Sequence, residues 1–287
     1  GSVLSQELNN NKEPDTIQKK NRIFDYIFLC FLLGNDFLPH FPALNIRTTG
    51  IDTILCVYKK VIGNSNDNIV NGSKIIWRNL RKIIIELANT EEELIRNEYK
   101  IRDRQSKNII NRKMEESERF VTIPMLDRSI EKYINPYEKQ WQERYYYQLF
   151  KIDIDDNRRK QISINYLEGL EWTLKYYTTG CVDWRWNYNY NYPPLLYDLS
   201  KYIPYFDTNF IKENDNKPVS PLIQLRYVLP KKNLYLLPNK IEQALLENYQ
   251  EIYTDTHNIS WAFCKYFWES HVDLPSIDLT ELIAITN

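Results

Sequence analysis

The nine residues from Gly34 to Pro42, Gly-Asn-Asp-Phe-Leu-Pro-His-Phe-Pro, place a carboxylate where the chain is expected to turn sharply. Gly34 can adopt the positive φ that ends a helix, and Asn35 and Asp36 are residue types whose side chains hydrogen-bond backbone amides in turns. The two prolines stiffen the backbone that follows. A carboxylate on such a fixed corner suits a metal ion, because its position is set before the ion arrives. The same spacing also fits a structural role, in which Asp36 closes the turn or caps the next helix.

A buried helix is predicted to hold this corner. Residues 23–33 form an apolar run interrupted only by Asp25, which is typical of a helix in a protein core. The run is too short to cross a bilayer, so no membrane segment is expected here. The corner therefore stands at the end of a core helix, which would fix the Asp36 carboxylate in space.

The corner closely resembles the GNDFLPHLP signature of the Xrn family of 5′→3′ exoribonucleases. It departs from that signature only at Phe41, where the family usually has Leu. In that family the Asp of the motif belongs to a cluster of acidic residues that binds divalent metal. The resemblance implies that Asp36 is a catalytic residue and a metal ligand. Asn35 and His40 are further candidates for RNA binding, although a histidine between prolines also fits a structural hydrogen bond.

The rest of the metal site is expected to lie outside this chain. In the family the other acidic ligands precede the motif, whereas Asp15 and Asp25 here match no family motif. A site for two Mg²⁺ ions needs several oxygen ligands in near-octahedral order, which one carboxylate cannot supply. The resemblance therefore implies that this chain is the downstream part of a nuclease, lacks the N-terminal nuclease half, and is inactive alone.

Aromatic residues alternate with polar residues between Trp184 and Tyr192, a pattern that predicts an edge strand with one aromatic face. Rings on such a face can pack into the core, and one or two of them can instead stack on nucleobases. Stacking contributes ~1–3 kcal/mol per base and tolerates any sequence, as a processive nuclease requires.

The stretch from Tyr166 to Pro194 also resembles the Xrn family, in which a segment reading roughly YVEGLxWVLxYYYxGCxSWxWYYPYHYAP is characteristic. A Trp of that segment stacks on the bases at the RNA 5′ end in the family enzymes. The matching residues here are Trp184 and Trp186, of which we favour Trp186. The chain departs from the pattern at Asn189, where the family has Pro, and at Asn191, where it usually has His. The second change puts any role of that histidine in doubt.

Two further stretches, from Pro221 to Pro238 and from Trp261 to Ile285, are similar to family segments, so the resemblance covers nearly the whole chain. Arg158 and Arg159 begin a predicted helix, where positive charge is unfavourable to the helix dipole. Both arginines are candidates for contacts with RNA phosphates, and a solvated surface is the alternative.

Apolar residues at helical spacing predict helices over residues 51–58, 74–87 and 158–177. Thr90 and Glu93 form a capping box for another helix, which would run to about residue 119. Its mixed charges fit a solvated helix or a projecting arm that touches RNA phosphates.

These elements predict a mainly α fold, namely an irregular multi-helical domain with a long charged projecting helix and few short strands. Residues 1–45 would form the C-terminal end of the nuclease domain, including the corner. Residues 46–287 would form the Xrn-type helical domain.

Net charge and cysteine spacing limit the nucleic-acid and metal partners that the chain can be expected to bind. The 287 residues carry a formal net charge of −1, which excludes a general basic field and leaves only a local patch for nucleic acid. The four cysteines lie far apart without a CxxC pair, so no zinc site is predicted. An intracellular, reducing location is expected, with nucleus and cytoplasm left open.

Together these features predict part of a metal-dependent 5′→3′ exoribonuclease that degrades single-stranded, 5′-monophosphorylated RNA to mononucleotides with Mg²⁺. The alternative is a catalytically dead scaffold derived from this family, which binds RNA or a protein. A DNA nuclease related to the flap endonucleases is a third hypothesis, and the aromatic segment and the C-terminal similarity argue against it.

Overall fold

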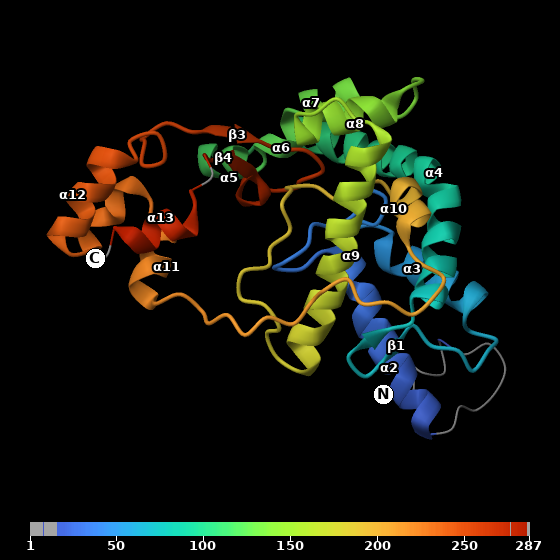
Figure 1. Ribbon diagram of the computed structural model, residues 1–287. Coiled ribbons are helices and arrows are strands. Elements are labelled where there is room, and N and C mark those ends of the chain that lie inside the picture. Colours follow the sequence, from blue (N-terminus) through green and yellow to red (C-terminus); the bar gives the residue numbers. More distant parts are fainter. Residues whose placement is uncertain (1–7, 9–15, 276, 286–287) are drawn as a thin grey trace. The chain divides into compact units, whose positions relative to one another are not determined.

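A computed structural model describes residue 8, residues 16–275 and residues 277–285. The chain divides into two compact units (Figure 1). Unit 1 comprises the described residues of Gly1–Lys113 and Met125–Asp215, and unit 2 comprises those of Met114–Pro124 and Asn216–Asn287. Unit 1 includes residues on both sides of the predicted domain boundary after residue 45, and that boundary stays a prediction.

Unit 1 is helical, with one short hairpin. Its elements are α2 (Thr16–Cys30), η1 (Phe31–Leu33), α3 (Gly50–Val61), β1 (Val70–Asn71), β2 (Lys74–Ile75), α4 (Trp77–Ile110), α7 (Ser129–Ile134), α8 (Trp141–Phe150), α9 (Asp156–Thr178) and α10 (Leu196–Tyr202). The hairpin is antiparallel and pairs Val70 with Ile75. α10 contacts both α4 and α9, and α3 packs on α4 (Figure 1). The mainly α fold with few short strands is therefore confirmed.

Unit 2 consists of short elements around a small core. They are α5 (Glu116–Val121), α11 (Pro221–Val228), η2 (Lys231–Leu236), α12 (Asn239–Asn248), β3 (Asn258–Ser260), η3 (Phe267–Glu269), β4 (His271–Asp273) and α13 (Leu279–Ala284). The described core contains Ile223, Leu234, Leu245 and Leu282. Arg226 is fully buried beside them, and its guanidinium donates a hydrogen bond to the Leu282 carbonyl (2.9 Å). The short helix α6 (Ile123–Leu126) spans the boundary between the units.

The two helices predicted over 74–87 and from Thr90 to about residue 119 are one helix that ends at Ile110, contrary to the prediction. α4 runs without a break from Trp77 to Ile110, while Lys74 and Ile75 form β2. The Thr90 hydroxyl donates to the Leu87 carbonyl inside the helix (3.2 Å) and caps nothing. The local capping signal is overridden because the buried apolar face continues across it, including Ile84, Leu87 and Ile95.

The charged face of α4 is also less solvated than its composition suggests. Glu91, Glu98 and Arg102 are buried, at 4%, 5% and 2% exposure. The Arg102 guanidinium pairs with buried Glu131 of α7, with an Nη2–Oε1 distance of 2.5 Å. Glu131 also pairs with Arg128 (2.5 Å), so one carboxylate joins two buried cations. These charges hold α4 in unit 1, because a buried charge is tolerated only when it is paired.

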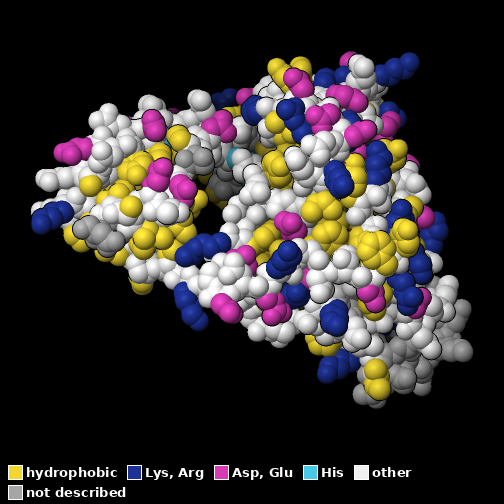
Figure 2. Space-filling model, in the orientation of Figure 1, with side chains coloured by type: hydrophobic (Ala, Val, Ile, Leu, Met, Phe, Trp, Pro, Cys, Tyr) yellow, Lys and Arg dark blue, Asp and Glu magenta, His cyan; other side chains and the backbone are white. Residues whose placement is uncertain are grey.

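None of the described helices is long and apolar enough to span a membrane. On the face shown in Figure 2, lysine and arginine side chains are interspersed with aspartate and glutamate. This mixture agrees with the net charge of −1 and leaves no broad basic field on that face of the described residues.

Candidate active site

The predicted corner is present at the end of α2. Phe31, Leu32 and Leu33 are buried in η1, and Gly34 follows with a φ of 96°. Its N–H donates to the Phe31 carbonyl (3.2 Å), which closes the last turn. A residue with a side chain would be strained at this φ, so Gly34 ends the helix as the sequence predicts.

Asn35 holds the turn that presents Asp36. The Asn35 Oδ1 accepts hydrogen bonds from the backbone N–H groups of Phe37 (2.8 Å) and Leu38 (2.9 Å). The Asn35 N–H donates in turn to the Leu38 carbonyl (3.0 Å). Asp36 stands exposed at the tip, and no described residue makes a hydrogen bond or ion pair with its carboxylate. Asn35 therefore closes the turn, and the Asp36 carboxylate is left available for a ligand.

Asp25, the other carboxylate of α2, has a structural environment. It is fully buried and accepts hydrogen bonds from the Tyr58 hydroxyl (2.5 Å) and from the N–H groups of Ile69 (2.8 Å) and Val70 (3.0 Å). Burial raises the pKa of its carboxyl, against the lowering effect of these hydrogen bonds and of Arg22. Asp25 therefore ties α2 to α3 and β1. Asp15 lies outside the described residues.

Aromatic side chains of helix α9 pack against the corner. The Tyr166 hydroxyl donates to the Pro39 carbonyl (3.0 Å), and its ring packs edge-on against Phe41. The Phe37 ring packs edge-on against Trp172 and Tyr176, with centroid distances of 4.8 and 5.2 Å. The corner is thus fixed both by its own turn and by a neighbouring helix.

The segment from Trp184 to Tyr192 forms no strand, which corrects the prediction of an edge strand. Tyr188 and Tyr190 pack on each other (5.5 Å) and onto other elements, so the alternation of the sequence does not reflect two faces of a sheet. Tyr188 packs against Tyr166 (5.5 Å), and Tyr190 packs against Phe150 (5.4 Å). The backbone N–H of Asn189 donates to an α9 side chain rather than to a strand, namely to Asn165 Oδ1 (2.9 Å).

Trp186 belongs to a stack of rings on α9. It stacks on Trp172 with a centroid distance of 5.4 Å and an interplanar angle of 25°. Trp172 stacks in turn on Tyr176 (5.1 Å, 10°). The indole N–H of Trp186 donates to Glu168 Oε2 (3.4 Å). Trp172 is nearly buried, whereas Trp186 is partly exposed and Trp184 is half exposed.

The corner that carries Asn35 and Asp36 packs on the same face of α9 as the Trp186 ring, whereas the two arginines lie elsewhere on that helix. Arg158 and Arg159 lie in the first turn of α9, about 16 Å along the helix from Gly169 at 1.5 Å per residue. Both guanidiniums already face carboxylates: Arg159 Nε lies 3.5 Å from Asp198, and Arg158 Nε lies 3.7 Å from Asp155. Their contact with RNA stays a prediction, as does that of His40.

Sequence reasoning missed three residues of this arrangement: Phe37, Trp172 and Gly169. The sequence contains a signal for Gly169 and Trp172, because Tyr166, Gly169, Trp172 and Tyr176 recur at helical spacing on one face of a predicted helix. Helical spacing alone does not show what packs against such a face.

The donor set fits one ligand of a magnesium site and no more. Asp36 offers a hard oxygen donor on a rigid backbone, as Mg²⁺ prefers. Among the described residues, no group of three or more His, Cys, Asp or Glu side chains could hold a metal ion. Further ligands would have to come from outside the described part of the chain.

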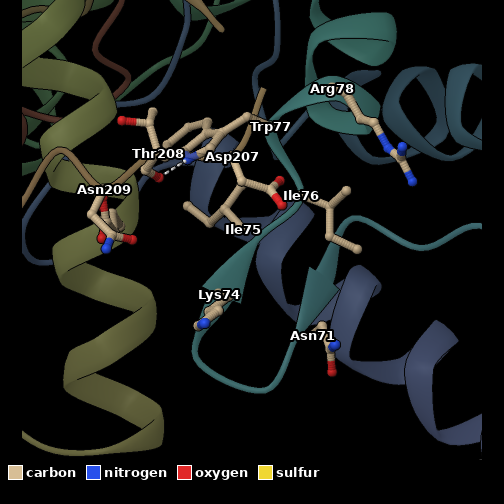
Figure 3. A pocket seen from close by; sticks show the side chains of 10 residues that line it. Asn71, Lys74, Ile75, Ile76, Trp77, Arg78, Asp207, Thr208 and Asn209 are labelled. Carbon is tan, nitrogen blue, oxygen red and sulfur yellow. Dashed lines mark hydrogen bonds between the residues drawn. The ribbon is translucent and has the colours of Figure 1, made fainter. Parts of the chain in front are cut away.

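A separate hollow of about 430 Å³ lies between the β1–β2 hairpin, the start of α4 and residues 207–209 (Figure 3). The Trp77 indole N–H donates to the Thr208 carbonyl at its wall (2.8 Å). Lys74 and Asp207 give it charges of both signs. Its described lining includes none of the predicted site residues, so it is distinct from the corner.

Comparison with known proteins places this geometry in a family. The family model described as the Xrn1 helical domain matches residues 16–126 and 125–287. The chain is 26% identical to a 5′-3′ exoribonuclease 2 homolog of Drosophila melanogaster, over 96% of this chain and 35% of the relative. It is 24% identical to the 5′-3′ exoribonuclease 2 of Gallus gallus, over 98% of this chain and 37% of the relative.

The 5′-3′ exoribonuclease 2 of Arabidopsis thaliana is similar at 24% identity, over 98% of this chain and 36% of the relative. The chain thus spans about a third of the length of these curated relatives. The family model covers almost all the described residues, and its match includes both the corner and the α9 face. The chain therefore belongs to the Xrn family of 5′→3′ exoribonucleases and contributes the Xrn1-type helical domain.

Proposed function

We propose that this chain is the part of a magnesium-dependent 5′→3′ exoribonuclease that supplies Asp36 to the metal site. The observation that supports this most directly is the exposed Asp36 carboxylate, which no described residue engages, although Asn35 Oδ1 hydrogen-bonds the backbone of the same turn at Phe37 and Leu38. The backbone that carries this carboxylate is fixed before an ion binds, which favours well-oriented coordination.

The chemistry divides between the ion and the protein. Bound magnesium supplies the Lewis acidity of two-metal phosphodiester hydrolysis. Asp36 would hold one ion, and Asn35 would keep the Asp36 backbone in place. Trp186 would stack on a base near the 5′ end, which orients the strand without reading its sequence. The proposed substrate is therefore single-stranded RNA with a 5′-monophosphate, degraded to mononucleotides inside the cell.

The proposal requires a partner for this chain. One carboxylate cannot order two Mg²⁺ ions, so the remaining ligands would come from an N-terminal nuclease half. We call the combination of this chain with that half the complete nuclease. The chain alone should bind RNA weakly and leave it intact.

The direct test compares RNA ends and protein forms. The complete nuclease is incubated with Mg²⁺ and single-stranded RNA that carries either a 5′-monophosphate or a 5′-hydroxyl, and the products are resolved by length. We expect mononucleotides from the 5′-monophosphorylated RNA, slower loss of the 5′-hydroxyl RNA, and no degradation with chelator or with this chain alone. Degradation by this chain alone would contradict the division of the metal site.

A catalytically dead scaffold is the second candidate, and Asn191 favours it. This exposed residue stands where the family usually has histidine. If the histidine takes part in catalysis in the relatives, its loss would weaken or abolish hydrolysis here. A complete nuclease that binds RNA but releases no nucleotides under any metal would support the scaffold over the enzyme.

A further inference from the structure

One face of α9 contacts both the corner and the Trp186 ring. The face consists of Tyr166, Gly169, Trp172 and Tyr176, which lie on the same side because helical residues recur every three to four positions. Tyr166 and Trp172 contact the corner, and Trp172 also stacks on Trp186. Gly169 lies between these two contact residues, at the centre of the face.

The corner and the Trp186 ring both come close to the α9 backbone at Gly169. A Cβ atom at this position would lie 2.5 Å from Leu38 Cδ2 and 2.8 Å from Trp186 Cη2. Carbon atoms make favourable contact at about 3.5–4.0 Å, so any side chain here would have to displace one or both neighbours.

The helix itself gives no reason for glycine at this position. Glycine inside a helix costs roughly 0.5–1 kcal/mol relative to alanine, so local stability favours alanine. Gly169 is not among the described residues with positive φ, and alanine would therefore fit the backbone. The requirement for glycine comes from the close approach of Leu38 and Trp186 alone.

We propose that Gly169 is a positioning residue, which sets the spacing between the Asp36 corner and the Trp186 ring. The proposal rests on the proposed function and deepens it. Leu38 is coupled to the corner by two hydrogen bonds, since its N–H donates to Asn35 Oδ1 and its carbonyl accepts from the Asn35 N–H. The Leu38 side chain is only 2% exposed and has little room to turn aside, so the collision at its Cδ2 is passed to the backbone turn that presents Asp36.

The spacing matters because one RNA strand must reach both groups. A base stacked on Trp186 and a phosphodiester beside the metal held by Asp36 belong to the same short stretch of chain. A methyl group at residue 169 would have to move its neighbours by about 1 Å to reach ordinary contact distance. A misplacement of this size can cost about 10²-fold in rate, whereas base stacking survives a small shift of the ring.

The test is the substitution Gly169→Ala in the complete nuclease. We expect kcat on 5′-monophosphorylated RNA to fall by about 10- to 100-fold, with KM changed by less than about threefold. The control is Gly63→Ala in the same unit, where a Cβ would lie 2.6 Å from a backbone atom, the Lys59 carbonyl oxygen, so that this variant is at least as damaging to the fold. Gly63 follows α3 and contributes nothing to the corner. At temperatures below the melting temperature of Gly63→Ala, the kcat of this variant should therefore equal that of wild type.

A second variant separates spacing from damage to the fold. Leu38→Ala removes the nearer of the two atoms that collide with the new methyl group. The double variant Leu38→Ala/Gly169→Ala should therefore lose less kcat than the two single losses predict. Strictly additive losses would overturn the proposal. An unchanged kcat in Gly169→Ala, or an equal fall in Gly63→Ala, would overturn it as well.

The spacing can also be measured in this chain without catalysis. In spectra of ¹⁵N-labelled tryptophan, the indole N–H signal of Trp186 reports its stacking on Trp172 and its bond to Glu168. Gly169→Ala should shift that signal, and Gly63→Ala should leave it in place. If the wild-type complete nuclease proves inactive, the proposed function fails. The indole signal still tests the positioning role of Gly169, and the absence of a shift in Gly169→Ala would overturn that role.

Discussion

Asn35 and Asp36 are adjacent residues with opposite tasks. The Asn35 Oδ1 atom accepts hydrogen bonds from two backbone N–H groups, whereas the Asp36 carboxylate has no described partner. The distinction follows from chemistry. An amide oxygen closes a turn as well as a carboxylate oxygen does, whereas a hard cation prefers an ionised carboxylate as its ligand. The corner thus separates the residue that fixes the backbone from the residue that would bind the ion.

Trp186 offers a prediction at the same scale. Trp186→Leu should weaken the binding of single-stranded RNA to this chain by ~1–3 kcal/mol, or about 5- to 150-fold, because one stacked base is lost. The measurement is fluorescence anisotropy of a labelled oligoribonucleotide at one fixed salt concentration, since phosphate contacts depend strongly on salt.

The control for this substitution is Trp268→Leu. Trp268 is exposed, at 67%, and belongs to unit 2, whereas the corner and Trp186 belong to unit 1. Its replacement makes the same chemical change and should leave RNA affinity within about twofold of wild type. Equal weakening by both variants would show that RNA binds exposed rings without preference, and the role assigned to Trp186 would be wrong.

At the scale of elements, α4 shows where local sequence signals fail. The capping box at Thr90 and Glu93 is a local pattern, and the buried face that overrides it is formed by contacts with distant elements. Glu91 is the clearest case. Its carboxylate accepts hydrogen bonds from the N–H groups of Leu196 (2.6 Å) and Tyr197 (2.9 Å), which begin α10 more than 100 residues later. Spacing along the chain cannot reveal such a partner.

Glu91 also gives the fold a defined pH dependence. Burial raises the pKa of its carboxyl from 4.5 to about 8, although the two backbone N–H groups act in the opposite direction. The folded chain therefore binds this proton more tightly than the unfolded chain. By linkage, the contribution of Glu91 to stability is greatest below pH 4.5 and falls as the pH rises toward 8.

The substitution Glu91→Gln isolates this effect, because glutamine keeps an acceptor oxygen and does not titrate. The free energy of unfolding of wild type minus that of Glu91→Gln should fall by roughly 2–4 kcal/mol between pH 5 and pH 8. Urea unfolding at several pH values measures it, with exposed Glu93→Gln as the control for removing a charge from α4. A difference that stays constant across this range would contradict the assignment.

Other elements followed from the sequence because their signals are local and agree with the packing. Asp155 caps α9 by accepting from the Arg158 N–H (2.8 Å), and Gly180 follows its end with a φ of 103°. The corner formed at Gly34 for the same reason. The edge strand predicted for the aromatic segment does not form, because alternation gives a strand only where another strand is present to pair with it.

At the scale of the whole molecule, the chain has the helical domain of its family and spans about a third of the length of its curated relatives. Unit 2 is built from two separate stretches of sequence, which the segment from Met125 to Asp215 interrupts. Family motifs identified the domain and the corner. They could not show that α9 joins the corner to Trp186, because that contact depends on three segments meeting at one helix face.

The central claim is that Asp36 is a metal ligand of an exoribonuclease. It requires that the complete nuclease lose activity when the charge of Asp36 is removed. Asp36→Asn preserves the size of the side chain and removes its charge. The control is Asp52→Asn, the same change at an exposed position in the first turn of α3. Loss of one ligand of an ion that stabilises the transition state by several kcal/mol corresponds to about 10²- to 10⁴-fold in rate.

The measurement is kcat on 5′-monophosphorylated RNA over a range of Mg²⁺ concentrations. We predict that Asp36→Asn lowers kcat by at least about 10²-fold and requires more Mg²⁺, while Asp52→Asn stays within about twofold of wild type. Full activity of Asp36→Asn at the same Mg²⁺ concentration as wild type would contradict the assignment of Asp36 as a ligand, and with it the proposed function of this chain.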